Sequence, residues 1–397
     1  MSIYKDKYLK YKKKYLEFKN KQSGGETTVT TLGKGGEGVA LHVKCDEPCD
    51  IVIKSTLKET DECNILNDIK KQINKIEHSV PREILLNTIV LTTNCDKGSM
   101  VFKYTGKCNL LTVIHNNKNN NLVNSEFNLI SKKLIITIIL FHHYVKYAHM
   151  DIKPENIIIK NSTDCNSYNL HHNNIAIIDF GLAINYNNSN INTLLRGTPN
   201  YLCPFIYTVH NNLYKIYDIA DVQTLLLLND IWLGILTLFI IINKTLPQYI
   251  IPEENRNIYY NHNFDINNLK IIHNALLHIP DRNMLPHVNV YLDIVTTYCN
   301  IMHNIYSNAL LNKKTKLDPV SIFTILFGSN IEKFDSDIYA DIIPKISADT
   351  FNISGEEILD THSTIITPTT MPPLDNKPKP EPKPIPKKSV LDHLPML

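Results

Sequence analysis

Short runs of alternating hydrophobic and polar positions fill residues 27–104, and turn residues separate them. Runs of this kind, rich in β-branched side chains, are typical of strands. A more polar stretch with helical spacing of its apolar positions, TDECNILNDIKKQINKIEH, lies within the region. The pattern predicts a small, mostly antiparallel sheet with one main helix, and its strands are VTTLG, GVALHVK, DIVIKS, NTIVLTT and SMVFKY.

Longer apolar stretches with helical spacing follow in residues 105–330, notably 131–149 and 225–242. Asn-rich segments at 116–121 and 161–174 interrupt them and are predicted to be surface loops. A strand-rich region followed by a mainly helical one indicates the α+β fold class.

The apolar run LLLLNDIWLGILTLFIII at 225–242 is long enough to cross a membrane. Asn229 and Asp230 lie inside it, however. A carboxylate at the centre of a membrane costs about 2.5–3.5 kcal/mol. The sequence therefore favours a helix buried in the core of a large domain over a membrane span.

The two ends of the chain differ in composition from the middle. Residues 1–22 carry eight lysines, and their five aromatic residues are spaced as one stripe of a helix. This leader could bind a partner, a membrane surface or nucleic acid, or pack on its own domain. Residues 331–360 form an extension. Proline-rich residues 361–397 are predicted to be an extended or disordered tail, because they lack the apolar residues of a core.

Charge and cysteine content argue against several classes of protein: nucleic-acid-binding, zinc-binding and secreted ones. The chain of 397 residues has a net charge of +2, and residues 1–22 alone carry +6, so the rest is mildly acidic. The main body thus shows no overall nucleic-acid-binding signature. The eight cysteines are scattered, without a second pair to complete a zinc site. They are expected to be free thiols in a reducing compartment. The lysine-rich start is unlike a secretory signal, so an intracellular, non-secreted protein is expected.

A glycine-rich stretch, LGKGGEGVA at 32–40, contains Gly33, Gly35 and Gly38 in the spacing G-x-G-x-x-G. Glycines let the backbone approach a polyphosphate and point amide N–H groups at it. A dinucleotide site would need a helix directly after the loop, whereas a strand follows here. The sequence therefore favours a lid between two strands over nucleotide phosphates. Lys54, in IVIK on the next strand, can reach the same phosphates.

Three further stretches carry polar groups next to apolar segments. HMDIKPEN at 149–156 supplies Asp151, Lys153 and Asn156, and IAIIDFGLA at 175–183 places Asp179 after a strand, where a carboxylate can hold a divalent metal. GTPNYLCP at 197–204 offers a Thr-Pro turn. Each of these three stretches, like the glycine-rich stretch and IVIK, could alone be a solvated turn. The occurrence of all five in this order argues against that interpretation.

With these motifs in this order, residues 27–330 resemble the eukaryotic-type Ser/Thr protein kinases. The resemblance implies a two-lobed fold, with a sheet-rich N-lobe at 27–104 and a mainly helical C-lobe at 105–330. It implies that the strand and hinge at 100–104 lie beside the adenine. ATP would be bound by Lys54 and by the residues of the glycine-rich loop: Leu32, Gly33, Lys34, Gly35, Gly36, Glu37, Gly38, Val39 and Ala40.

The resemblance also assigns chemical roles. Asp151 would accept the proton of the substrate hydroxyl, Lys153 would contact the γ-phosphate, and Asn156 and Asp179 would hold Mg²⁺. A helix glutamate should pair with Lys54. Glu83 in PREILL fits best by local sequence, while Glu62 and Glu77 lie in or near the longer helical stretch and remain alternatives.

Several positions depart from the family pattern. Met150 stands where an arginine usually pairs with a phosphate on the activation loop, which predicts activity without that phosphorylation. Cys203-Pro204-Phe205 replaces the usual Ala-Pro-Glu. In the family that glutamate pairs with a later arginine, which Arg282 resembles, so the role of Arg282 is open without the glutamate. DIWLG at 230–234 is one residue shorter than usual, but Asp230 is still expected to cap the backbone of the catalytic loop.

The expected function is an ATP- and Mg²⁺-dependent kinase acting on Ser/Thr hydroxyls of protein substrates. A pseudokinase scaffold that binds partners through the leader and the tail is the alternative, and a small-molecule phosphotransferase on the same fold is a third reading. The leader resembles N-terminal leaders of proteins from giant DNA viruses, and heavy use of Asn, Ile and Lys fits an AT-rich genome.

Overall fold

The computed structural model describes the strand and helix regions and part of the loops. The described residues are 28–34, 38–44, 50–56, 61–96, 99–117, 122–162, 164–166, 170–189, 196–198, 201, 203, 220–245, 266–310, 315–333, 339 and 342. The chain divides into two units, residues 1–344 and 345–397, and all described residues belong to the first. The predicted leader and proline-rich tail lie outside the described residues.

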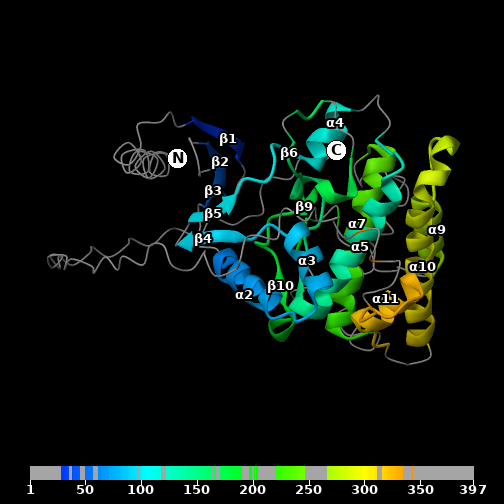
Figure 1. Ribbon diagram of the computed structural model, residues 1–397. Helices are drawn as coiled ribbons and strands as arrows, with labels where there is room; N and C mark the ends of the chain where they lie inside the picture. Colours follow the sequence, from blue (N-terminus) through cyan, green and yellow to red (C-terminus); the bar gives the residue numbers. More distant parts are fainter. Residues whose placement is uncertain are drawn as a thin grey trace, which may run out of the picture. The chain divides into compact units, whose positions relative to one another are not determined.

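A five-stranded sheet forms the N-terminal region, with the strand order β1-β2-β3-β5-β4 and antiparallel pairing throughout. Figure 1 shows its strands in dark blue to cyan at one side of the helical region. The predicted antiparallel sheet is confirmed. Its strands are β1 (Thr28–Lys34), β2 (Gly38–Lys44), β3 (Asp50–Thr56), β4 (Thr92–Asp96) and β5 (Ser99–Lys103).

Two helices, not one, accompany this sheet: α2 (Glu62–Asn74) and α3 (Ser79–Thr88). The strand predicted at NTIVLTT is therefore wrong over its first residues, which belong to α3, and β4 begins only at Thr92. The helical spacing was present in the sequence, because α3 buries Pro81, Ile84, Leu85 and Thr88 on one face.

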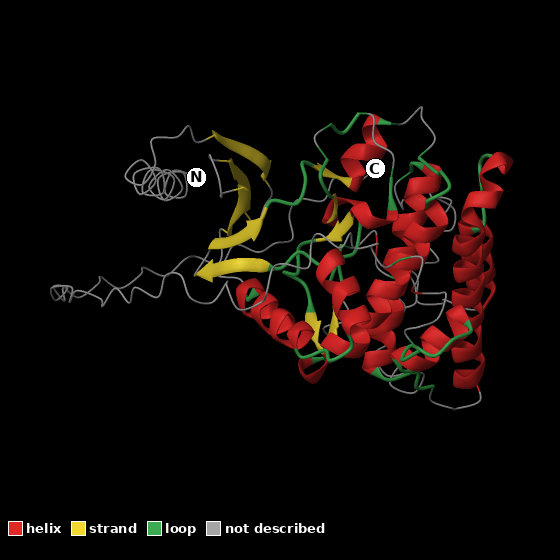
Figure 2. Cartoon of the chain, viewed as in Figure 1, coloured by secondary structure: helices red, strands yellow, loops and turns green. Residues whose placement is uncertain are grey.

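Long helices form the C-terminal region (Figure 2). Helix α5 packs against both α7 and α10, and α10 also contacts α9 and α11. The helix predicted at 131–149 is confirmed in part, because α5 ends at Leu140 and a π-helical turn, Phe141–Val145, continues it. The helices are α4 (Leu110–Asn116), α5 (Phe127–Leu140), α7 (Val222–Asn243), α9 (Ile266–Leu276), α10 (Leu285–Leu310) and α11 (Pro319–Phe327).

Helix α7 carries the apolar run that resembles a membrane span. It is long and apolar enough to cross a membrane, but its most apolar window is entirely buried inside the fold. Every residue from Thr224 to Ile242 is buried, including Asn229 and Asp230. The predicted core helix is confirmed.

Short strands position the loops between the long elements. In the three-stranded sheet β6-β8-β9, β8 (Ile157–Ile159) pairs antiparallel with both β6 (Cys108–Asn109) and β9 (Ile175–Ile177). β7 (Tyr147–Ala148) pairs with β10 (Ile184–Asn185). Because β7 and β8 flank residues 149–156 and β9 and β10 flank residues 178–183, these two loops are brought side by side.

Two disulfides in the part of the chain that the structure describes correct the expectation of free thiols for four cysteines. Cys63 on α2 is bonded to Cys95 on β4, and Cys108 on β6 is bonded to Cys165. The bonded cysteines are 32 and 57 residues apart in the sequence, and this spacing alone does not predict which of them pair. Cys203 and Cys299 are buried thiols outside these disulfides, as expected.

Candidate active site

One row of paired residues crosses four strands of the N-terminal sheet. Gly33 pairs with Ala40, Ala40 pairs with Lys54, and Lys54 pairs with Met100. The β1–β2 hairpin that carries the glycine-rich loop is thus directly beside the strand that carries Lys54. The sheet brings together the two groups predicted to meet nucleotide phosphates.

The other loop residues lie around this row. Lys34 pairs with Val39, Gly38 begins β2, and Leu32 stands where the β1–β2 register shifts, with 37% of its surface exposed. Gly35, Gly36 and Glu37 lie outside the described residues.

Lys54 joins the two regions of the fold through an ion-paired cluster. Its Nζ atom lies 2.9 and 2.8 Å from the two carboxylate oxygens of Glu62 and 2.7 Å from Oδ1 of Asp179. Glu62 is buried at the first position of α2, and Asp179 follows β9. One ammonium group therefore holds a carboxylate from the sheet region and a carboxylate from the helical region.

Glu62, and not Glu83, is the partner of Lys54, so the assignment of Glu83 is wrong. Glu83 lies on the separate helix α3, which packs against α5 and β9. Residues 76–78 between the two helices are not helical, so Glu83 cannot continue the face of α2 that carries Glu62.

Burial and charge compete in setting the pKa values of this cluster. Burial lowers the pKa of Lys54, but the charges of Asp179 and Glu62 outweigh it and raise the pKa overall. Burial raises the pKa of Glu62, and Lys54 offsets only part of that change. Burial also opposes ionisation of Asp179, yet Lys54 holds its pKa below the usual value. Lys54 and Asp179 are accordingly charged at neutral pH.

A second cluster surrounds Asp151. Its Oδ1 atom accepts a hydrogen bond of 2.6 Å from the hydroxyl of Thr198, and its Oδ2 atom lies 2.8 Å from Nζ of Lys153. Lys153 also donates to the Thr198 hydroxyl oxygen at 2.6 Å. The amide of Asn156 donates to Oδ2 of Asp151 at 2.9 Å. The structure thus gathers the three predicted residues of this loop around one carboxylate.

Thr198 is a site residue that the sequence reasoning missed. The sequence indicates only a Thr-Pro turn in GTPNYLCP, because nothing in the local pattern shows that this turn folds back onto Asp151. Thr198 lies 47 residues after Asp151 in the sequence, and only the folded chain brings the two side chains into contact.

Asn156 connects the two loops of the site. Its side chain donates to the backbone oxygen of Asp151 at 2.8 Å, and its own backbone oxygen accepts from the N–H of Ile178 at 2.9 Å. Asp179 is the next residue along. The contact therefore places Asn156 and Asp179 on neighbouring chain segments, as required of two ligands of one ion.

Asp230, a buried residue on α7, fixes the backbone at the start of the loop formed by residues 149–156, the predicted catalytic loop. Its carboxylate accepts from the N–H groups of His149 at 2.6 Å and Met150 at 2.9 Å, and His142 lies 2.8 Å from it. Met150 has a left-handed φ of 67°. The two backbone bonds stabilise this sparsely populated conformation, so the predicted capping role of Asp230 is confirmed.

His149 links the catalytic loop to the strand before Asp179. Its Nδ1 accepts from the N–H of Asp151, so the other ring nitrogen is the one that donates to the carbonyl of Ile178. Burial lowers the pKa of His149. A neutral imidazole with one fixed tautomer fits these two bonds.

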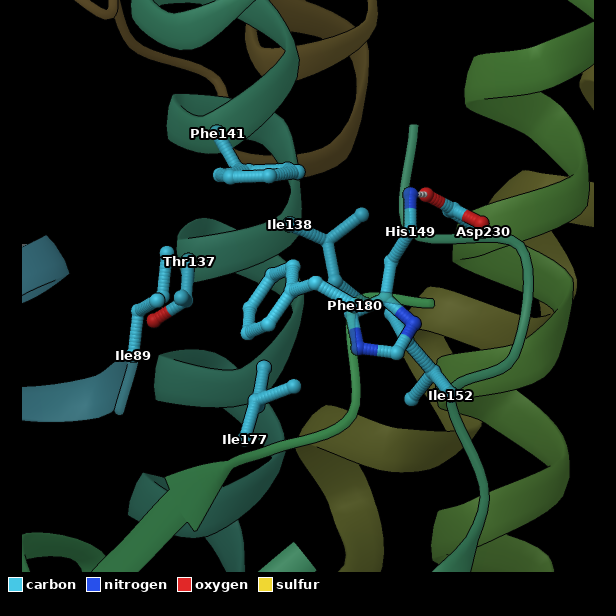
Figure 3. A pocket seen from close by; sticks show the side chains of 9 residues that line it. All are labelled: Ile89, Thr137, Ile138, Phe141, His149, Ile152, Ile177, Phe180 and Asp230. Carbon is cyan, nitrogen blue, oxygen red and sulfur yellow. Dashed lines mark hydrogen bonds between the residues drawn. The ribbon is translucent and has the colours of Figure 1, made fainter. Parts of the chain in front are cut away.

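Phe180 anchors the segment after Asp179 in the core. Its ring centroid lies 5.8 Å from that of Phe141 and 4.7 Å from that of His149 (Figure 3). A cavity of about 10 Å³ beside it, lined mostly by apolar side chains, is no larger than one water. The side chain next to Asp179 is therefore held in the apolar interior while Asp179 reaches Lys54.

The segment after Thr198 is tied to α7. The indole N–H of Trp232 donates to the backbone oxygen of Tyr201 at 3.1 Å, and Asn229 accepts from the N–H of Cys203 at 3.2 Å. Arg282 is exposed at the start of a short 3-10 helix, Arg282–Met284. Phe205 lies outside the described residues.

The residues present fit a magnesium–nucleotide complex. The amide nitrogen of Asn156 is engaged with Asp151, which leaves its side-chain oxygen as the atom able to bind a metal. Asp179 uses Oδ1 for Lys54 and has a second carboxylate oxygen. Oxygen ligands from an amide and a carboxylate are those that Mg²⁺ prefers.

Comparison with known proteins gives the same outline. The protein kinase domain family matches residues 27–271. Rabbit (Oryctolagus cuniculus) myosin light chain kinase 2 is 37% identical over 87 residues, which cover 22% of this chain and 12% of that protein. A carbon catabolite-derepressing protein kinase of Candida glabrata is 25% identical over 224 residues, covering 55% of this chain and 32% of its own length. The chain thus spans a small part of these relatives.

A solved crystal structure of a kinase domain is similar to 75% of this chain and 93% of its own length, with a TM-score of 0.45 and 16% identity. The family match covers more than half of the chain and includes the glycine-rich loop, Lys54, Asp151 and Asp179. The chain belongs to the protein kinase domain family.

Proposed function

We propose that this chain is an ATP- and Mg²⁺-dependent protein kinase that transfers the γ-phosphate of ATP to Ser/Thr hydroxyls of proteins. The observation that carries the proposal is the double ion pair of Lys54 with Glu62 and Asp179. Phosphoryl transfer needs a placed cation, a metal site and an oriented nucleophile more than it needs covalent help from the protein.

In this mechanism Lys54 binds the α- and β-phosphates as a point charge. Glu62 keeps the ammonium in place, because its carboxylate is buried and bonded through both oxygens. Mg²⁺, when bound, neutralises charge on the phosphates. Asn156 and Asp179 would supply its protein ligands.

Asp151 would accept the hydrogen bond, and then the proton, of the substrate hydroxyl. Its Oδ1 already accepts a hydroxyl hydrogen bond, that of Thr198 at 2.6 Å. Lys153, 2.8 Å from the same carboxylate, is placed to neutralise the γ-phosphate as it moves. The position of Lys153, two residues after Asp151, supports Ser/Thr rather than Tyr acceptors, because it is the pattern of the Ser/Thr-directed kinases that the chain resembles.

Activity without phosphorylation of the activation loop is part of the proposal. Met150 is fully buried, and the amide of Asn229 donates to its sulfur at 3.6 Å. A thioether has no charge and no donor with which to bind a phosphate. Met150 therefore cannot bind a phosphate on the activation loop. Treatment of the purified chain with a phosphatase should leave its activity intact, and loss of activity would refute this part.

Two other functions compete. A scaffold that binds partners through its leader and tail is favoured by the changes at Met150 and Cys203, and a small-molecule phosphotransferase would use the same catalytic groups. The charged cluster at Lys54 favours catalysis over the scaffold, because a scaffold has no need of a buried glutamate beside a lysine.

We also propose an intracellular location and a viral origin. ATP as co-substrate supports the first, whereas the two disulfides would be unusual in a reducing compartment. The leader and the Asn-, Ile- and Lys-rich composition support the second. Imaging of the tagged full chain in expressing cells tests the location, and export to the medium would contradict it.

Incubation of the full chain with γ-labelled ATP, Mg²⁺ and generic protein acceptors tests the chemistry of the acceptor. Acid hydrolysis of the labelled proteins should yield phosphoserine and phosphothreonine. Phosphotyrosine alone, or label only in small molecules, would refute the proposed specificity. The Asp151→Asn variant identifies label that comes from a contaminating kinase.

A further inference from the structure

Two histidines and a glutamate converge in the C-terminal region, at a place that the proposed function does not use. Glu126 immediately precedes α5, while His171 and His172 lie in the segment that leads into β9. Oε2 of Glu126 is 2.5 Å from Nδ1 of His172 and 3.5 Å from Nε2 of His171. The three donor atoms all lie within 4.8 Å of one another.

This donor set suits a transition metal better than Mg²⁺ or Ca²⁺. Imidazole nitrogens are preferred by Zn²⁺ and its neighbours, whereas Mg²⁺ and Ca²⁺ are bound almost wholly by oxygen. Tetrahedral zinc with ligands at about 2.0–2.1 Å separates its donor atoms by about 3.3 Å. The observed separations of 2.5 and 3.5 Å bracket that value, and the two imidazole nitrogens lie within 4.8 Å of each other, so small side-chain rotations would bring the three donor atoms to one ion.

The surroundings are those of a site that an ion can enter. The side chain of His172 is 9% exposed, that of Glu126 28% and that of His171 44%, so one side is closed by protein and the other is open to solvent. The open side leaves room for a water as fourth ligand, as in zinc sites with two histidines and one glutamate.

Charge around the cluster is balanced rather than wholly favourable. Burial would raise the pKa of Glu126, but its hydrogen bond with His172 and the histidine charges lower it overall, so the carboxylate is ionised. Lys133, on the following turns of α5, lies within electrostatic range of His172 and opposes a bound cation. The carboxylate charge of Glu126 offsets that opposition.

We propose that Glu126, His171 and His172 bind one zinc-class divalent transition metal ion, which fastens the segment before β9 to the start of α5. The same segment is already attached at two other points: Asn124 donates to the backbone oxygen of Leu170 at 3.1 Å, and Cys165 is disulfide-bonded to Cys108. A metal would add a third attachment, four residues before the strand that leads to Asp179 begins at Ile175. This role is structural and does not depend on kinase activity.

Titration of the metal-free full chain with Co²⁺ and then Zn²⁺ at neutral pH tests the proposal. The wild-type chain should bind one Co²⁺ at this cluster with visible d–d bands stronger than those of aqueous Co²⁺ and no thiolate charge-transfer band, because its ligands are N and O only. Zn²⁺ should displace the Co²⁺ and raise the thermal unfolding midpoint.

The variants His171→Ala and Glu126→Gln should bind Zn²⁺ about tenfold more weakly or worse and lose the rise in the midpoint. His115→Ala, an exposed histidine on α4, should behave as wild type. Circular dichroism of the metal-free variants shows whether they fold, and His171, being 44% exposed, is the safer substitution. Equal zinc affinity in wild type and His171→Ala, or a thiolate band in the Co²⁺ spectrum, would overturn the proposal.

Discussion

Glu62 illustrates how much one residue decides in this fold. Its side chain is only 3% exposed and is bonded to Lys54 through both oxygens, so no water can replace it without leaving a buried charge unpaired. Glu83, in contrast, lies on a different helix and makes no part of this cluster.

Substitution of these two glutamates should have different effects on the use of ATP. Glu62→Gln should lower kcat/KM for ATP by about 10²-fold, because Lys54 loses the charge that positions it. Glu83→Gln, the matched change on α3, should leave kcat/KM unchanged. Steady-state kinetics with varied ATP measures both, and an equal loss in the two variants would refute the pairing.

Lys133 provides a prediction about pH. Its side chain is fully buried on α5, and burial, aided by the charge of Lys160, lowers its pKa to about 7. The unfolded chain holds this proton up to about pH 10.4. Between pH 7 and that value the unfolded state binds more protons, so the free energy of unfolding rises with pH.

Replacing the lysine should remove this pH dependence. Relative to Lys133→Met, the wild type should gain about 1.4 kcal/mol of unfolding free energy per pH unit above 7. Lys132→Met, at the half-buried neighbouring position, should keep the wild-type slope. Urea unfolding at several pH values measures the slopes, and parallel curves for wild type and Lys133→Met would contradict the burial argument.

At the residue scale, the site residues that lie within short motifs could be predicted from the sequence. A contact between residues far apart in the sequence could not. Lys54, Asp151, Asn156 and Asp179 each lie in a motif whose neighbours restrict its role. Thr198 reaches Asp151 across 47 residues, and no local pattern reports such a contact.

At the scale of elements, the segment between β5 and β6 is packed too closely for any side chain at Gly106. A Cβ atom there would lie 2.1 Å from the backbone oxygen of Ile159. Backbone cannot rotate away as a side chain can. The segment that joins the sheet region to the helical region is therefore fixed by this glycine.

Gly106→Ala should cost about 1–3 kcal/mol of unfolding free energy, the usual range for overpacking. Gly234→Ala on α7 is the matched control, since its Cβ would meet only the terminal methyl groups of Ile138 and Ile135 at 2.8 and 2.9 Å. Alanine also favours a helix interior by about 1 kcal/mol. Thermal unfolding of both variants decides, and a smaller loss for Gly106→Ala than for Gly234→Ala would contradict the packing argument.

Elements with strong periodicity were predictable, and short or competing ones were not. The sheet and the helix α7 followed from hydrophobic pattern alone. The strand predicted at NTIVLTT overlaps the last two residues of α3, because Thr88, Ile89 and Val90 are β-branched, although the preceding residues bury one helical face.

At the scale of the whole molecule, two disulfides within the described ranges join segments that are distant in the sequence. The Cys63–Cys95 bond spans 32 residues and ties α2, which carries Glu62, to the edge strand β4. A loop of that length implies a stabilisation of about 3–4 kcal/mol on the chain-entropy account.

Reduction should therefore lower the thermal unfolding midpoint of the wild type, and Cys95→Ser should show a lower midpoint without reductant. Cys299→Ser serves as the control, because Cys299 is a free, buried thiol. Peptide mapping without reductant checks the bonds. An unchanged midpoint with dithiothreitol, together with free thiols at all four positions, would contradict these pairs.

The two-region architecture was predictable because each region has its own period of hydrophobic residues. The disulfides were not, since cysteine spacing alone cannot choose among pairings. The central claim is that the groups at the junction of the two regions, Asp151 among them, transfer phosphate from ATP to protein, with Lys54 of the sheet holding Asp179 of the helical region.

Transfer of label from γ-labelled ATP to protein acceptors, measured for wild type and Asp151→Asn with and without Mg²⁺, tests that claim most directly. We expect Mg²⁺-dependent transfer by the wild type and a rate lower by about 10²–10⁴-fold in the variant. A folded wild-type chain that binds ATP but transfers no label, to added proteins or to itself, would contradict it.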